Sequence, residues 1–249
     1  MEKDRKTLIL IPAFNEGRNL LQVIAGIKQF YPEVNILVVN DGSSDNTYTV
    51  AKKAGAEVID LTFNLGYGVA LQTGYKYALK KGYQYLLQMD GDGQHDPVYI
   101  HNLLKPVKSG ETDLAIGSRF TSEKENGTYR AGFIKRTGMK IFAIITSMFI
   151  GQKITDATSG YQAMNSTILK LFSSDIYPVD FPDADVLIML HRAGFKIKEV
   201  PVAMHQNGSN QYMHHGMIAF YYVFKMVLSI FVDLLRKLPK DYRVEQLRE

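Results

Sequence analysis

Short, mostly apolar runs alternate with segments of helical periodicity along the first 117 residues. The runs cover residues 7–14, 35–40, 57–61, 83–89 and 113–117. Between them, apolar side chains recur every three or four positions, as they do over residues 20–27. Strands that are apolar on both faces and are joined by helices are typical of a parallel sheet that helices cover on both sides. The sequence therefore predicts an α/β domain with a mostly parallel central sheet.

Composition narrows the class of protein and of site. A chain of 249 residues can bury a sizeable core, and its 46% hydrophobic and 22% charged residues are typical of globular proteins. It has no cysteine, which excludes disulfides, thiolate chemistry and cysteine-based zinc sites. The net charge of +4 suits an anionic ligand or a membrane surface, and equally a lone basic tail.

Three common catalytic motifs are missing. Gly66-Tyr67-Gly68 does not continue into a dinucleotide-binding motif, because the third glycine would fall at Leu71. No segment matches the phosphate-binding loop of nucleoside triphosphatases, and none matches the nucleophile elbow of serine hydrolases. Hydride transfer, triphosphatase chemistry and serine hydrolysis are therefore disfavoured.

Polar residues follow three of the predicted strands, after Phe14, Asn40 and Met89. Ligands of parallel α/β sheets bind at the carboxyl ends of the strands. There Asp90 and Asp92, two residues apart, can face the same side and bind a divalent cation whose other ligands are phosphate oxygens and water. The alternative is an acidic turn after a buried strand, which is the commoner meaning of an isolated Asp-x-Asp pair. Convergence of the three clusters favours a site for a metal-bound nucleoside diphosphate.

Six short motifs occur in a characteristic order. They are IPAFNE (11–16), NDGSSD (40–45), NLGYG (64–68), DGDGQH (90–95), GSRF (117–120) and DATSGY (156–161). Together they resemble the family 2 glycosyltransferases, over about residues 7–202. The subgroup most similar to this chain contains dolichol-phosphate mannose synthase and bacterial polyprenyl-phosphate glycosyltransferases. The resemblance implies the GT-A fold and inverting transfer of a hexose from a nucleotide sugar, which we expect to be UDP-linked.

The resemblance also implies roles for individual residues. The nucleotide would contact Pro12, Phe14, Glu16, Asp41, Gly68 and Asp90. The metal, Mg²⁺ or Mn²⁺, would be surrounded by Asp90, Asp92 and Gln94. The diphosphate or an acceptor phosphate would face Arg119, Arg136 and Lys135. The acceptor would lie near Asp156 and Ser159.

The need for a catalytic base depends on the acceptor. Inversion takes place in one in-line displacement, and a hydroxyl acceptor needs a carboxylate to accept its proton. Asp183 and Asp185 are the candidates for that base. A polyprenyl phosphate is already anionic and needs orientation by Arg or Lys instead. Both acceptors stay open, the second being a saccharide or glycolipid hydroxyl in cell-surface polysaccharide synthesis. A non-catalytic nucleotide-sugar-binding subunit is the alternative from another class.

Two amphipathic segments, 133–150 and 216–237, carry apolar stripes with basic residues beside them. Such stripes pack in a core, form oligomer interfaces or lie in a membrane interface. We expect attachment at the membrane interface, because a lipid-phosphate acceptor requires contact with the membrane. No apolar run is long enough for a confident spanning helix. Residues 1–204 would form the catalytic domain, and 205–249 an acceptor-side loop, helix and charged tail. The protein would sit at the cytoplasmic face of the cell membrane, with a small membrane-protein partner or as a homo-oligomer, and without nucleic acid.

Several single residues have plainer interpretations. Asp45 is expected to cap a helix, and His95 and His101 are expected at the surface. One of His205, His214 and His215 could contact the metal or the diphosphate. Tyr67 is expected only to cover the nucleotide, and the residues from Pro239 onward to form a frayed tail.

Overall fold

The computed structural model describes residues 4, 6–121, 133–178, 182–206, 225, 228–232, 235 and 239–248. For residues 133–136 it describes the backbone alone. The side chains of Lys135 and Arg136, and all of His214 and His215, therefore lie outside the described residues.

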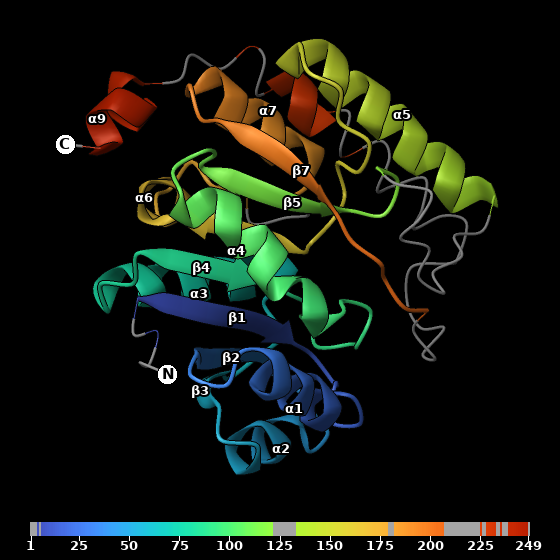
Figure 1. The fold of residues 1–249 in the computed structure, drawn as a ribbon, viewed down its shortest axis with the longest axis vertical. Coiled ribbons are helices and arrows are strands. Elements are labelled where there is room, and N and C mark those ends of the chain that lie inside the picture. Colours follow the sequence, from blue (N-terminus) through green and yellow to red (C-terminus); the bar gives the residue numbers. More distant parts are fainter. Residues whose placement is uncertain are drawn as a thin grey trace.

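In the described part of the chain, the strands form one seven-stranded sheet (Figure 1). The strands are β1 Thr7–Ala13, β2 Asn35–Asp41, β3 Glu57–Leu61, β4 Tyr85–Gln88, β5 Leu114–Ser118, β6 Gln162–Asn165 and β7 Ile197–Pro201. Their spatial order is β3-β2-β1-β4-β6-β5-β7. Strand β6 runs antiparallel to its neighbours β4 and β5, whereas all other neighbours pair in parallel. The other six strands thus share one direction, which confirms the mostly parallel sheet.

Helices cover both faces of this sheet. Because successive strand residues point to opposite sides, the strands contribute side chains to both apolar cores. Leu8 and Leu10 belong to one apolar core, whereas Ile9 and Ile11 belong to the other. The first core includes residues of α3 Tyr67–Lys80, α5 Phe133–Ile150, α6 Ser166–Phe172, α7 Ala184–Arg192 and α9 Val244–Arg248. The second includes residues of α1 Leu20–Phe30, α2 Thr47–Lys53 and α4 Ile100–Lys108. Short 3-10 helices, η1 Pro97–Tyr99 and η2 Lys240–Tyr242, precede α4 and α9.

The expectation of a frayed tail from Pro239 is wrong. Val244 is buried, and its backbone N–H donates to the carbonyl of Ala193 at 2.9 Å. The Arg248 guanidinium contacts Asp113 at 2.8 Å. These partners lie far away in the sequence, so the charged composition of the segment gave no sign of them. Helix α6, which follows β6 directly, was not predicted either.

The two amphipathic segments expose apolar side chains in the described residues. On α5, Phe142 faces the core, whereas Ile144 is 61% and Met148 76% exposed. In the second segment Ile230 is buried, whereas Phe231 is 58% exposed. No helix in the described ranges has the length and apolarity needed to cross a membrane.

The docked α9 leads to a stability prediction. Val244→Asp places a carboxylate at a buried position in apolar contact with Gly194. Burying such a charge costs about 2 kcal/mol or more, so the melting temperature should fall by roughly 4–8 °C. Differential scanning calorimetry measures this shift.

The matched control is Gln246→Asp, which adds the same charge at an exposed position of the same helix. It should leave the melting temperature nearly unchanged. Equal melting temperatures for the two variants would show that α9 is not docked.

Candidate active site

The functional motifs lie in separate parts of the chain but meet at one edge of the sheet. The parallel strands β1, β2, β4, β5 and β7 all end at this edge. Because β6 is antiparallel, it begins there, and the preceding loop 156–161 reaches the same edge. The position of the antiparallel strand between β4 and β5 therefore brings this loop beside the loop that follows β4.

The loop after β4 is held by its own residues. The backbone N–H of Asp90 donates to Nδ1 of His95 at 3.0 Å. The Asp92 carboxylate accepts from the backbone N–H of Gln94 at 2.9 Å and from its side-chain Nε2 at 2.8 Å. Gly93 turns the chain between them with a φ of +81°, a conformation that glycine adopts readily. Gln94 here orients Asp92.

The Asp90 carboxylate is enclosed on several sides but stays 32% exposed. Its Oδ1 accepts from the Tyr67 hydroxyl at 2.9 Å, and its Oδ2 lies 3.7 Å from Nε2 of His95. A Cβ atom on Gly160 would come within 2.9 Å of the Tyr67 hydroxyl oxygen and 3.3 Å of Asp90 Oδ2, so a glycine allows this close approach. Burial raises the pKa of Asp90, although the Tyr67 hydrogen bond and the charge of Arg119 oppose the rise.

Glu16 adds a third acidic group beside this loop. Burial raises the pKa of Glu16, and the charges of Asp92, Asp90 and Asp45 raise it further, although a hydrogen bond from Asn19 lowers it. Neighbouring carboxylates whose charges raise the pKa of a third form a site where a cation is favourable. Within the described ranges, no three His, Cys, Asp or Glu side chains converge to hold a metal by themselves. The donor set therefore fits a metal that also takes phosphate oxygens and water.

Asp41 fixes the loop that leads into α3. Its buried carboxylate accepts from the backbone N–H groups of Leu65 at 2.8 Å and Gly66 at 2.9 Å. Gly42 has a φ of +64°, and a Cβ there would lie 2.4 Å from the carbonyl carbon of Phe63. The ends of β2 and β3 are thus tied together, and any contact between Asp41 and a base or ribose stays a prediction.

The remaining predicted nucleotide residues lie around this loop. Pro12 is buried near the end of β1, and Phe14, directly after β1, is 46% exposed. Gly68 is buried in the first turn of α3. These positions place the predicted residues at the same edge as Asp41 and Asp90.

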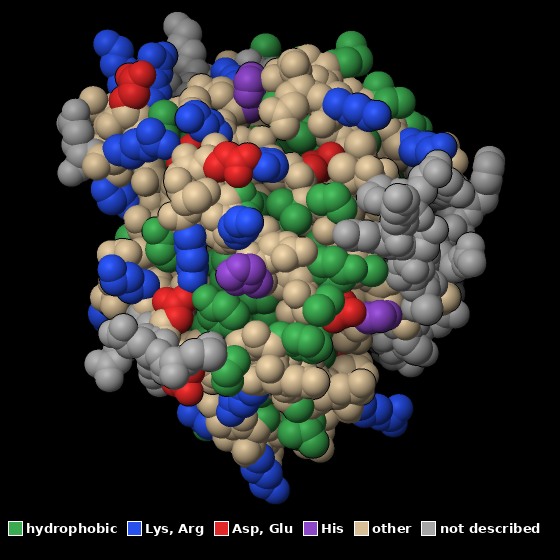
Figure 2. Space-filling model, in the orientation of Figure 1, with side chains coloured by type: hydrophobic (Ala, Val, Ile, Leu, Met, Phe, Trp, Pro, Cys, Tyr) green, Lys and Arg blue, Asp and Glu red, His purple; other side chains and the backbone are tan. Residues whose placement is uncertain are grey.

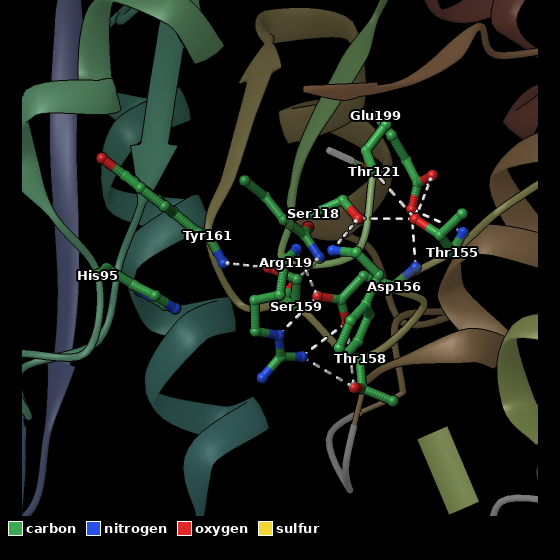
Figure 3. Close-up of polar contacts among 12 residues, drawn as sticks. His95, Ser118, Arg119, Thr121, Thr155, Asp156, Thr158, Ser159, Tyr161 and Glu199 are labelled. Atoms are coloured by element: carbon green, nitrogen blue, oxygen red, sulfur yellow. Dashed lines mark hydrogen bonds and ion pairs between the residues drawn. The ribbon is translucent and has the colours of Figure 1, made fainter. Parts of the chain in front are cut away.

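Arg119 and Asp156 bind each other (Figure 3). Nε and Nη2 of Arg119 donate to Oδ2 and Oδ1 of Asp156, both at 2.6 Å, and Asp156 is fully buried. Planar two-bond pairs of this kind fix the guanidinium strongly. Ser159, the other predicted acceptor residue, is buried in the same loop, where its Oγ accepts from the N–H of Tyr161. The structure thus brings Arg119, Asp156 and Ser159 together.

Glu199 on β7 anchors this loop and was missed in the sequence. Its Oε1 accepts from the N–H groups of Thr155 and Asp156, at 2.9 and 2.8 Å, and its Oε2 from the Thr155 hydroxyl (Figure 3). Burial raises the pKa of Glu199. A single acid in a mostly apolar strand was the only available signal.

The two candidate bases occupy different environments. Asp185 is fully buried, and its carboxylate accepts from the N–H groups of Asp183 and Val186 and from the Ser229 hydroxyl at 2.6 Å. Burial raises the pKa of Asp185. Asp183 is half-buried, and its charge contributes to raising the pKa of Tyr67, so Asp183 lies within electrostatic reach of the Asp90 site. Both catalytic assignments stay predictions.

The histidines differ from expectation. His101 is exposed, as predicted, but the surface prediction for His95 is wrong. The His95 ring is buried and stacks on Tyr161, with 4.8 Å between the ring centroids and 9° between the planes. His205 pairs with Asp96 at 3.0 Å beside the Asp92 loop. Asp45 accepts from the N–H groups of Thr47, the first residue of α2, and of Gly17, but the N-cap of that helix is Asn46 and not Asp45 as expected.

The buried ring of His95 leads to a pH prediction. Burial and the charge of Arg119 lower the pKa of His95 to about 4, although Asp92 and Asp156 oppose the shift. The unfolded chain, with its ordinary pKa of 6.5, then binds the proton first as the pH falls. Titration of His95 should leave the free energy of unfolding unchanged above pH 6.5. It should lower that free energy as the pH falls from 6.5 to 4. At pH 4.5 the loss should be about 2–3 kcal/mol.

The measurement is urea unfolding at pH 7 and pH 4.5 without added divalent metal. His95→Asn, whose amide oxygen can still accept the Asp90 N–H, should lose less stability than the wild type between these pH values. His101→Asn, at an exposed position, should lose as much as the wild type. Equal losses in all three proteins would contradict the buried, neutral imidazole.

Comparison with known proteins places the fold and the motifs in a family. The model of the family described as Glycosyl transferase family 2 matches residues 8–172, which is more than half of the chain. The chain is 34% identical to polyprenol monophosphomannose synthase of Mycolicibacterium smegmatis, over 80% of this chain and 77% of that protein. It is 30% identical to undecaprenyl-phosphate mannosyltransferase of Micrococcus luteus, over 79% of this chain and 82% of that protein.

Solved structures agree on the fold. Glucosyl-3-phosphoglycerate synthase from Mycobacterium tuberculosis in complex with phosphoglyceric acid superposes with a TM-score of 0.68. The superposition covers 92% of this chain and 80% of the chain of that enzyme, at 18% sequence identity. The same enzyme in complex with Mn²⁺, UDP and glucosyl-3-phosphoglycerate gives a TM-score of 0.64 at 20% identity, over 93% of this chain and 79% of its own. The chain therefore has the GT-A fold and belongs to glycosyltransferase family 2.

Proposed function

We propose that the chain transfers a hexose, with inversion, from a UDP-linked sugar to a polyprenyl phosphate at the membrane surface, with a divalent metal. The observation that carries this proposal is the group of three carboxylates at the sheet edge where the family motifs meet, in which the charges of Asp90 and Asp92 raise the pKa of Glu16. Such a group favours a cation. A cation held by two protein carboxylates has coordination positions left for the oxygens of a diphosphate.

The protein residues at this edge divide into a metal group and a nucleotide group. Asp90 and Asp92 would hold Mg²⁺ or Mn²⁺, with Gln94 keeping Asp92 in place. When bound, the metal would neutralise the charge that develops on the departing diphosphate. The nucleotide would lie along the ends of β1 and β2 and contact Pro12, Phe14, Glu16, Asp41 and Gly68. The complex of the M. tuberculosis enzyme with Mn²⁺ and UDP supports this choice of ligands.

The acceptor site would lie beside the Arg119–Asp156 pair. Because Asp156 and the loop held by Glu199 fix Arg119, its charge is already oriented before any ligand binds. Arg119, with Arg136 and Lys135 at the start of α5, would bind the anionic oxygens of the acceptor. The relatives named for polyprenol and undecaprenyl phosphate support a lipid phosphate.

The chemistry of the nucleophile also favours a phosphate over a hydroxyl. A phosphate is ionised at neutral pH and attacks without giving up a proton. Asp185 is fully buried and hydrogen-bonded through both oxygens, a poor arrangement for taking a proton from an acceptor. Asp183 is the group that a hydroxyl acceptor would use.

Membrane contact would come from the exposed apolar side chains of α5 and of Leu228, Phe231, Val232 and Leu235. Ile144, Met148 and Phe231 are more than half exposed, although each is a large apolar side chain. Lys140 on α5 is exposed in the same helix and can meet lipid phosphates. Apolar insertion combined with basic residues is how interfacial helices bind a bilayer. Such contact at the cytoplasmic face would bring the site to a lipid acceptor.

The acceptor prediction is tested by incubating the enzyme with radiolabelled UDP-sugars, Mn²⁺ and undecaprenyl phosphate. We expect label in an organic-soluble, acid-labile product, because a glycosyl phosphate hydrolyses readily in acid. Label found only in an added saccharide acceptor would reject the lipid phosphate. No transfer to either acceptor, with all common UDP-sugars, would reject the proposed function.

The membrane prediction is tested by flotation with vesicles that contain anionic phospholipids. Replacing both Ile144 and Met148 by Asp should reduce the bound fraction several-fold, since each charge opposes insertion into the bilayer. Asn102→Asp, which adds a charge at an exposed position of α4 on the other face of the sheet, is the control. Unchanged flotation of the double variant would contradict contact through α5.

A further inference from the structure

A chain of hydrogen bonds runs from the buried Tyr75 to the partly exposed Asp90. The Tyr75 hydroxyl donates to Oε1 of Gln88 at 2.5 Å, and Nε2 of Gln88 donates to the Tyr67 hydroxyl oxygen at 3.1 Å. The Tyr67 hydroxyl in turn donates to Oδ1 of Asp90 at 2.9 Å. Tyr67 and Tyr75 lie on α3, and Gln88 is the last residue of β4. The hydrogen bonds therefore link this helix to the strand that precedes the Asp90 loop.

The donors in this chain all point toward Asp90. A tyrosine hydroxyl carries one proton, and the oxygen of Tyr67 already accepts the Gln88 amide. Its proton is therefore directed at Asp90. Gln88 cannot easily turn over, because its Oε1 is held by the Tyr75 hydroxyl, and both of these residues are buried.

The surroundings of Tyr67 hold it in this position. Gly160 packs against its hydroxyl so closely that a Cβ would lie 2.9 Å from the oxygen. The buried Tyr75 ring contacts Phe172 and Tyr177 in the core, with centroids 5.2 and 5.5 Å away. The hydrogen bond to Asp90 is thus connected, through Gln88 and Tyr75, to buried side chains of the core.

We propose that Tyr67, anchored by Gln88, is a positioning residue that orients the Asp90 carboxylate for the metal–diphosphate complex without contacting the metal. This rests on the proposed role of Asp90 in the metal site. A hydrogen bond to a metal ligand fixes its orientation before binding, and losing such a contact weakens metal affinity by about 10–100-fold. The role differs from covering the nucleotide, which would affect nucleotide affinity alone.

The test measures Mn²⁺ binding by electron paramagnetic resonance in the presence of saturating UDP. Tyr67→Phe keeps the ring and removes the donor, and it should weaken Mn²⁺ binding at least about tenfold. Gln88→Met removes the anchor with a side chain of similar volume and should weaken it in the same direction. Tyr77→Phe makes the same change on α3 away from this network and should bind like the wild type.

A melting curve for each variant shows that the protein remains folded. Wild-type Mn²⁺ affinity in folded Tyr67→Phe would overturn the positioning role, as would a loss in UDP affinity with Mn²⁺ affinity unchanged. The variant Asp92→Asn distinguishes a failure of the positioning role from a failure of the proposed function. If that variant also bound Mn²⁺ like the wild type, the metal site itself would be wrong, and both proposals would fall.

Discussion

The concentration of negative charge after β4 is the constraint on which the rest of the site depends. Asp90, Asp92 and Glu16 lie close enough to raise the pKa of Glu16, and the fold keeps them there. His95 and Gln94 hold the two aspartates from within the loop, and Tyr67 holds Asp90 from α3. Figure 2 shows acidic, basic and histidine side chains scattered over one face of the molecule. A bound cation would relieve the repulsion among the three carboxylates.

The reversed strand β6 explains how the second half of the site is built. Its direction places the loop 156–161 at the same edge as the ends of the parallel strands, against Asp90 and Tyr67. Within that loop Asp156 holds Arg119, and Glu199 holds Asp156 from the neighbouring region of β7. The proposed metal group thus lies beside a fixed cation. Under the proposed function, donor and acceptor would bind next to each other along one edge.

Much of this could be predicted from the sequence, since apolar runs locate the strands and parallel strands must end at one edge. That reasoning placed Asp41, Asp90 and Asp92 together, and the motif order identified the family. It failed wherever a side chain is buried by residues distant in the sequence. His95 stacks on Tyr161, Asp185 meets Ser229, and Val244 packs beside Gly194. Local patterns carry no information on such partners, so a histidine in a polar loop and a charged tail were both placed wrongly in solvent.

The most direct test of the account is the anomalous diffraction signal of Mn²⁺ in crystals soaked with Mn²⁺ and UDP. The account predicts one strong peak within about 2.5 Å of a carboxylate oxygen of Asp90 or Asp92, with the UDP diphosphate bound to the same ion. The uridine should lie along the ends of β1 and β2. A manganese peak remote from both aspartates, or UDP bound away from this edge of the sheet, would contradict it.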